Sequence, residues 1–131
     1  MSDFHRFALS LACLALPGCA SLKNFNEDVA GIFSTSGQRE LDVGVKAYED
    51  GEYPYAARLL QTSLDAGLRG TTNRVRAHKY LAFLHCATNR IQQCRDEFRK
   101  ILEIDSSFDL REDESGHPVW GPVFRSVKGK K

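Results

Sequence analysis

The sequence contains few of the motifs on which catalytic and metal sites are built. Its four cysteines and four histidines show no CxxC, HxxxH or HExxH spacing, and GxSxG and glycine-rich phosphate loops are absent. A hydrolytic set would have to combine Ser63, His117 and the acids at 112–114, each of which packing or loop solvation explains. We therefore expect no catalytic residues, no cofactor and no small-molecule substrate.

Neither sign of charge predominates. The 131 residues include 18 Lys and Arg against 17 Asp and Glu, which gives a formal net charge of +1. Acids and bases are interspersed, so no long-range field favours nucleic acid as a partner. Proline (4) and glycine (10) are sparse and lie mostly at breaks between apolar patterns. This composition favours a single small helical domain.

The amino-terminal region contains one short apolar run. It spans residues 7–16, FALSLACLAL, which is too short for a membrane-spanning helix but suits the core of a signal peptide. The run ends in Leu16-Pro17-Gly18-Cys19, which resembles the lipobox of bacterial lipoproteins. The resemblance implies a signal peptide at 1–18, cleavage before Cys19 and lipidation of its thiol. An ordinary secretory signal and a piece of buried helix are the alternatives.

A lipid on Cys19 would attach the protein to a membrane without spanning it. In lipoproteins of this type an acidic residue after the cysteine often signals inner-membrane retention. Ala20 is not acidic, so we expect an outer-membrane lipoprotein that faces the periplasm. Residues 19–37 then form a lipidated spacer, whose apolar stripe either lies on the membrane or docks on the domain (Phe25, Val29, Ile32 and Phe33).

Two helical hairpins follow the spacer. Residues 38–67 contain two amphipathic patterns that are separated at Asp50-Gly51-Glu52, where Gly51 suits a helix end and Pro54 suits the next first turn. Residues 77–105 contain two more patterns, separated at residues 88–90. Connections this short make the paired helices antiparallel. The predicted fold class is therefore all-α.

The two hairpins share a register that resembles the tetratricopeptide repeat. The small and large positions of that repeat are matched in the first hairpin by Gly44, Ala47, Gly51, Tyr53, Ala56, Leu60 and Ser63. The second hairpin places Ala82, His85, Asn89, Ile91, Cys94, Phe98 and Ile101 in the same register. Gly51 and its counterpart Asn89 are 89 − 51 = 38 residues apart, so extra residues lie in the connection at 67–73.

The carboxyl-terminal part should cover the last open face of the repeats. Phe108 and Leu110 are expected to fold back as a hydrophobic plug, followed by a polar loop at 111–116. A short helix then presents Trp120, Val123, Phe124 and Val127 on one side, with Trp120 in the core rather than exposed for binding. The folded domain is predicted to be residues 38–127, with a basic tail at 128–131.

Three segments carry a more particular resemblance: AHKYLAFLHC, QCRDEFRKIL and FDLREDESGHPVWGPVFR. They are similar to tetratricopeptide lipoproteins encoded with type VI secretion systems, sometimes called TssQ-like. The resemblance implies a non-enzymatic accessory factor that binds protein partners in the cell envelope. A pilotin-like or pilus-assembly lipoprotein that escorts a client is the alternative. A peptidoglycan remodeller is disfavoured, because no carboxylate pair or sugar-binding aromatic cleft is evident.

Cys86 and Cys94 give the sharpest chemical signal. In an exported protein, two cysteines on facing helices can form a disulfide. The repeat register argues against it, since Cys86 lies one place past the position that faces the partner helix and the Cα separation could exceed ~7 Å. We expect a disulfide, with two buried thiols as the alternative. A zinc site that uses His78 and His85 is disfavoured, because these lie two turns apart and structural histidines are commoner.

The resemblance also implies a binding surface, because the first helix of each repeat lines the concave face of a tetratricopeptide array. The residues placed there are Leu41, Val45, Tyr48, Arg76, Lys79 and Phe83. Arg76 and Lys79 would receive a partner's carboxylate, while Tyr48 and Phe83 would hold an apolar side chain. The alternative is that Tyr48 and Phe83 are core residues and that the cations are solvated.

Overall fold

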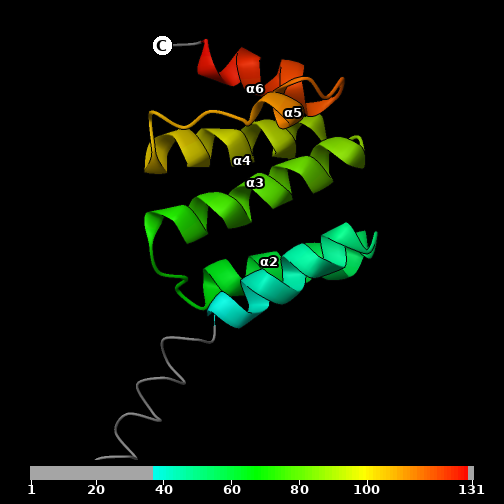
Figure 1. Ribbon diagram of the computed structural model, residues 1–131, viewed down its shortest axis with the longest axis vertical. Coiled ribbons are helices and arrows are strands. Elements are labelled where there is room, and N and C mark those ends of the chain that lie inside the picture. Colours follow the sequence, from blue (N-terminus) through cyan, green and yellow to red (C-terminus); the bar gives the residue numbers. More distant parts are fainter. Residues whose placement is uncertain (1–36, 130–131) are drawn as a thin grey trace, which may run out of the picture.

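The computed structural model describes residues 37–129, and every regular element in this range is a helix. A helical segment covers residues 37–49 (cyan in Figure 1). It is followed by α2 (Tyr53–Asp65), α3 (Thr71–Ala87), α4 (Ile91–Ile104), α5 (Glu112–Ser115) and α6 (Trp120–Lys128). The predicted all-α class is confirmed. The predicted signal peptide, Cys19 and the spacer's apolar stripe lie outside the described residues.

The helical segment 37–49 and α2 form the first antiparallel pair (Figure 1). Gly51 adopts a φ of 80°, and its N–H donates to Tyr48 O at 3.1 Å while the Glu52 N–H donates to Ala47 O at 2.8 Å. These two bonds form a Schellman motif, which satisfies the last carbonyls of the helix. Pro54 lies in the first turn of α2, where its missing N–H leaves no bond unmade. The turn predicted at Gly51 is confirmed.

α3 and α4 form the second pair and are joined by the same motif. Asn89 takes a positive φ of 59°, its N–H donates to Cys86 O at 3.2 Å, and the Arg90 N–H donates to His85 O at 2.7 Å. Asparagine tolerates this left-handed conformation better than most residues. Gly51 and Asn89, which the sequence register aligns, therefore perform the same structural role.

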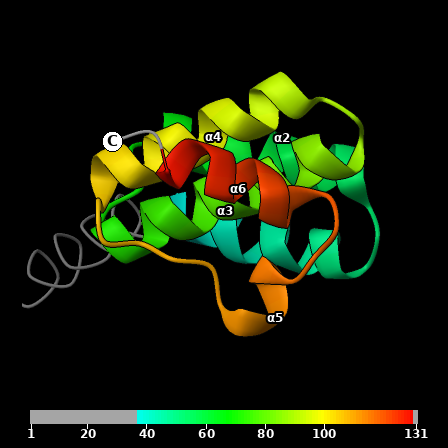
Figure 2. The ribbon, with the colours of Figure 1, turned by 90° about the horizontal axis from the view of Figure 1, so that it is seen from above.

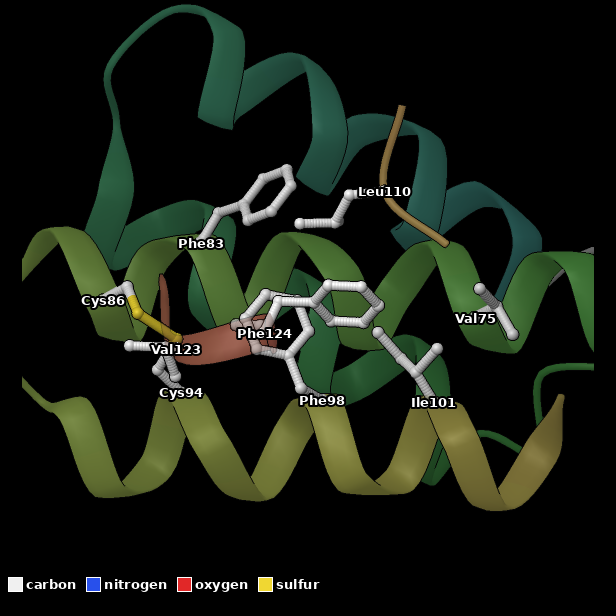
Figure 3. Packing of buried hydrophobic residues seen from close by; sticks show 10 residues of the cluster. Val75, Phe83, Cys86, Cys94, Phe98, Ile101, Leu110, Val123 and Phe124 are labelled. Atoms are coloured by element: carbon white, nitrogen blue, oxygen red, sulfur yellow. A yellow bond between two sulfur atoms is a disulfide. The ribbon is translucent and has the colours of Figure 1, made fainter. Parts of the chain in front are cut away.

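α3 is the central helix, because it buries side chains on both of its sides. One cluster fills the space between α3, α2 and the helical segment 37–49, and contains Leu41, Val45, Ala47, Ala56, Leu60, Leu68, Ala77, Leu81 and Leu84. The other lies between α3, α4 and α6, and Figure 3 shows its members: Val75, Ala82, Phe83, Cys86, Cys94, Phe98, Ile101, Leu110, Val123 and Phe124. The core is thus continuous through α3 from the first pair to the carboxyl-terminal helix.

The carboxyl-terminal segment returns across α3 and α4 and ends in α6. Figure 2 shows α6 lying over these two helices, with α5 to one side. Leu110 is buried, and the Phe108 ring meets the Phe124 ring edge-to-face at 5.8 Å between centroids. The hydrophobic plug predicted at these two residues is confirmed.

Two details of this segment correct the sequence-based expectation. The region expected as a polar loop contains the single turn α5, at whose start the Arg111 N–H donates to Glu114 Oε2 at 3.2 Å. Lys128, expected to begin a basic tail, is the last residue of α6, and its Nζ donates to Phe108 O at 3.2 Å. Both corrections arise from contacts that the local apolar pattern does not encode. None of the helices within residues 37–129 has the length and apolarity needed to cross a bilayer.

Candidate functional site

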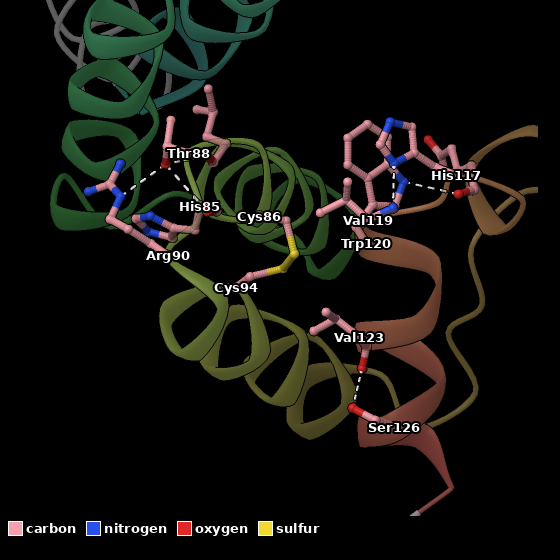
Figure 4. The surroundings of a disulfide bond; sticks show 12 residues. His85, Cys86, Thr88, Arg90, Cys94, His117, Val119, Trp120, Val123 and Ser126 are labelled. Carbon is pink, nitrogen blue, oxygen red and sulfur yellow. Dashed lines mark hydrogen bonds between the residues drawn. A yellow bond between two sulfur atoms is a disulfide. The ribbon is translucent and has the colours of Figure 1, made fainter.

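The cysteine pair forms a disulfide between α3 and α4 (Figures 3 and 4). Cys86 and Cys94 have a Cα–Cα separation of 5.2 Å, inside the range that disulfides require. Both residues are buried. The predicted disulfide is confirmed, and the objection from the repeat register does not hold, because the Schellman turn brings the two helices together at this end.

The turn beside the disulfide is held by polar contacts (Figure 4). Thr88 Oγ1 donates to Leu84 O at 2.8 Å and accepts from Arg90 Nε at 3.0 Å. His85 Nδ1 is buried and has no hydrogen-bond partner among the described residues. Burial and the neighbouring Arg90 lower the pKa of His85, so its imidazole is neutral at neutral pH. Thr88 thus holds the turn, while His85 leaves one buried nitrogen without a partner among the described residues.

His78 pairs with the buried carboxylate of Glu97 and not with His85. Its Nδ1 lies 2.6 Å from Glu97 Oε2, and Lys100 Nζ donates to Glu97 Oε1 at 2.7 Å. Burial raises the pKa of Glu97, but the hydrogen bonds from His78 and Lys100 outweigh it and hold the pKa below its usual value. No group of three His, Cys, Asp or Glu side chains within residues 37–129 is arranged to hold a metal ion. The histidine therefore connects α3 to α4.

The buried position of Glu97 was not predicted, although the sequence carries a signal for it. Cys94, Glu97, Phe98 and Ile101 follow the i, i+3, i+4, i+7 spacing of one helical face, and all four are buried. A lone acid within an apolar row needs hydrogen-bonding or charged partners. His78 on α3 and Lys100 on α4 are those partners.

Three of the predicted partner-binding residues are core residues. Leu41 and Val45 are buried between the helical segment 37–49, α2 and α3, and Phe83 is buried beneath Trp120. The Phe83 and Trp120 rings stack with centroids 4.3 Å apart and an interplanar angle of 21°. Their burial leaves these side chains inaccessible to a partner in this fold, which corrects the expectation drawn from the repeat register and agrees with the core alternative for Phe83. Trp120, half-buried, packs against the core as predicted.

The two predicted cations are both paired within the chain. Arg76 Nη1 donates to Asp42 Oδ1 at 3.1 Å, and both side chains remain well exposed. Lys79 Nζ donates to Glu114 Oε1 at 2.5 Å, in a pair that leaves only 15% and 11% of the side chains exposed. The Lys79 ammonium also lies 5.7 Å from the Phe83 ring centroid. Arg76 is thus available at the surface, whereas α5 and the residues around it cover Lys79.

Tyr48, the remaining predicted residue, belongs to a group of three tyrosines that we call the tyrosine surface. Its ring centroid lies 5.6 Å from that of Tyr53 and 5.0 Å from that of Tyr80. The three rings come from the helical segment 37–49, α2 and α3 respectively. Tyr53 is 40% exposed, and Tyr48 and Tyr80 are half-buried. The surface therefore presents aromatic area from three helices at one place.

The hydroxyl groups of Tyr48 and Tyr80 stay protonated. Burial, with smaller effects of Tyr53, Tyr80 and Glu114, raises the pKa of Tyr48 to about 12. Burial and the nearby Glu49 raise the pKa of Tyr80. None of the three hydroxyls makes a hydrogen bond to another group in the part of the chain that the structure describes. The tyrosine surface can consequently offer a partner aromatic ring surface as well as hydroxyl donors.

Comparison of the chain with known protein families, with curated proteins and with solved structures finds no match in any of the three.

Proposed function

We propose that the protein is a lipid-anchored, non-enzymatic component of a bacterial cell envelope that binds another protein as an accessory factor of a type VI secretion system. The observation that carries the proposal is the Cys86–Cys94 disulfide, since such bonds persist in oxidising compartments. It agrees with the lipobox-like residues that end at Cys19. We propose a type VI secretion system because the second hairpin and the carboxyl-terminal segment resemble lipoproteins encoded with such systems.

We also propose that the helices form two tetratricopeptide-like repeats with a terminal helix. In support, each hairpin joins its helices through the same Schellman motif, at Gly51 and at Asn89. A Cβ at Gly44 would lie 3.1 Å from Leu60 Cγ, so the small residue permits close helix approach. α6 then provides the terminal cover that repeat arrays need.

The partner would bind the tyrosine surface. Tyrosine and arginine dominate the energetics of many protein interfaces, and Arg76 extends from the same helix as Tyr80. Its guanidinium uses only one N–H on Asp42, so it retains donors for a carboxylate. A partner segment that pairs an apolar side chain with an acid fits this combination.

Anchoring and binding are tested separately. Replacing Cys19→Ser should release the protein from the membrane fraction, and retention there would contradict the lipid anchor. For binding, we expect Tyr53→Ser to reduce type VI effector export. Tyr55→Ser is the matched control, because Tyr55 is equally exposed at 42% but points about 200° around α2 from Tyr53.

The two variants also separate the alternatives. Equal export by both, with normal protein levels, would show that the tyrosine surface is not the binding site. If deletion of the gene leaves type VI export intact but mislocalises a secretin, the pilotin-like alternative is correct. Export measurements and localisation of the secretin therefore decide between the two functions.

A further inference from the structure

A cavity of ≈ 380 Å³ lies between α6 and the segment that precedes it. Its lining includes Phe124, Arg125 and Lys128 from α6, together with Asp109 and Ser115. None of these residues belongs to the tyrosine surface, and the cavity does not depend on the membrane anchor. Its volume is within the range of sites that hold small ligands or single side chains.

Both walls of the cavity are fixed by backbone contacts. Gly121 lies so close to Ser115 that a Cβ there would fall well inside 3.0 Å of the Ser115 carbonyl oxygen. That oxygen also accepts a hydrogen bond from Arg125 Nη1 at 3.1 Å. On the other side, Lys128 Nζ donates to Phe108 O at 3.2 Å and to Asp109 Oδ2 at 2.5 Å. The two cations are thus held in place at the cavity.

The chemistry of the lining combines an apolar floor with positive charge. Most of the accessible lining is apolar. Phe124 lies at its base and is itself only 1% exposed, and the Lys128 ammonium lies 5.7 Å from its ring centroid. Arg125 uses one N–H on Ser115 O and keeps the others free within the described structure. Lys128 lowers the pKa of Asp109 through their hydrogen bond, so this acid is ionised and neutralises one of the two cations. One positive charge remains beside the apolar floor.

We propose that this cavity binds the carboxyl terminus of a partner polypeptide whose last side chain is apolar. The terminal carboxylate accepts hydrogen bonds from the free N–H groups of Arg125, and the side chain covers the apolar floor. A planar carboxylate matches the guanidinium fork. Inorganic phosphate would satisfy the charge but leave the apolar floor uncovered, so it fits the site less well.

The test uses small probes and NMR amide shifts of the isotope-labelled full chain carrying Cys19→Ser. N-acetylphenylalanine should shift the amides of residues 109 and 121–129. N-acetylphenylalanine amide, which lacks the charge, should bind at least about tenfold more weakly, since hydrogen bonds to a charged group are lost. Arg125→Gln should weaken binding of the acid by a similar factor, and Arg58→Gln, a substitution on α2, should leave it unchanged.

Each other outcome overturns the proposal. Equal binding of N-acetylphenylalanine and its amide, or shifts confined to other residues, would show that the cavity does not recognise a carboxylate. Phosphate binding as tight as that of N-acetylphenylalanine would remove the role of the apolar floor. Octanoate binding more tightly would assign the site to a fatty acid instead of a polypeptide terminus. The fluorescence of Trp120 reports whether each variant retains the folded carboxyl-terminal segment.

Discussion

Reduction of the Cys86–Cys94 disulfide should lower the free energy of unfolding by about 2.5 kcal/mol at 25 °C. The value comes from the sequence separation of 8 residues, because a cross-link removes loop-closure entropy from the unfolded chain. The constant part of that entropy contributes about a quarter of the effect, and the part that grows with loop length contributes about three quarters. Both cysteines are buried against Phe98 and its neighbours. Two separate thiols occupy more room there than a disulfide, so reduction also disturbs packing and the loss should not be smaller.

The assay is urea unfolding followed by circular dichroism, with and without reductant. Replacing Cys13 and Cys19 by serine leaves Cys86 and Cys94 as the only cysteines. For a domain of this size an m-value of about 1 kcal/mol/M is expected, so the midpoint should fall by roughly 2.5 M. The melting temperature should fall by roughly 10–20 °C. Thiol titration of the denatured protein should find no free thiol before reduction and two afterwards.

Two results would refute this reasoning. A midpoint that is unchanged by reductant, once the thiols are shown to be reduced, would mean that the cross-link does not restrict the unfolded chain as calculated. Free thiols in protein purified from an oxidising compartment would mean that the pair does not close there. The second result would also remove the main support for export.

Three further predictions concern the packing of the other helices. Gly121→Ala should destabilise the fold by about 3 kcal/mol, because the new Cβ would collide with Ser115 O. Gly116→Ala is the control: Gly116 has a φ of −76° and its Cβ would make only ordinary contacts, so stability should change by less than about 1 kcal/mol. The denaturant midpoints of the two variants test this. Glu97→Gln should lower the free energy of unfolding by about 2 kcal/mol at pH 7. Because folding lowers the pKa of Glu97, the stabilisation by its ionised carboxylate is fully present above the unfolded pKa of 4.5 and is lost as the pH falls through the folded pKa. The stabilities of the wild type and the variant should therefore converge as the pH falls through the folded pKa of Glu97, and a constant difference would contradict the ion-pair assignment. Trp120→Ala should cost about 3 kcal/mol, because the stack on Phe83 and the Nε1 hydrogen bond to Glu114 O at 3.0 Å are lost; thermal unfolding by circular dichroism measures it.

The helices were predictable because their signals are local. Apolar spacing gives the four long helices, and Gly51 marks the first turn by its tolerance of positive φ. Even Asn89, a weaker left-handed residue, could be placed because the repeat register aligns it with Gly51. The disulfide pairing followed from two cysteines on either side of one short turn, although the register alone misjudged their separation.

The proposed binding surface could not be predicted, because it depends on contacts between distant parts of the chain. The register correctly places Lys79 and Phe83 on one helix, but nothing in their spacing indicates that Glu114 and Trp120 will cover them. Leu41 was assigned to the surface for the same reason, since burial depends on how α2 and α3 pack around it. Tyr53 was missed as a surface residue, because its contact with Tyr48 and Tyr80 forms only after three helices assemble.

The contacts of Glu114 and Trp120 have a consequence for any protein that approaches α3. The sequence led us to expect from a partner a carboxylate on Lys79 and an apolar side chain on Phe83. The chain already supplies both, through Glu114 and Trp120. A tethered ligand of this kind acts at an effective concentration in the millimolar range. An external segment that needs Lys79 and Phe83 must therefore compete with the chain's own carboxyl-terminal segment. A partner that binds only the tyrosine surface would meet no such competitor among residues 37–129.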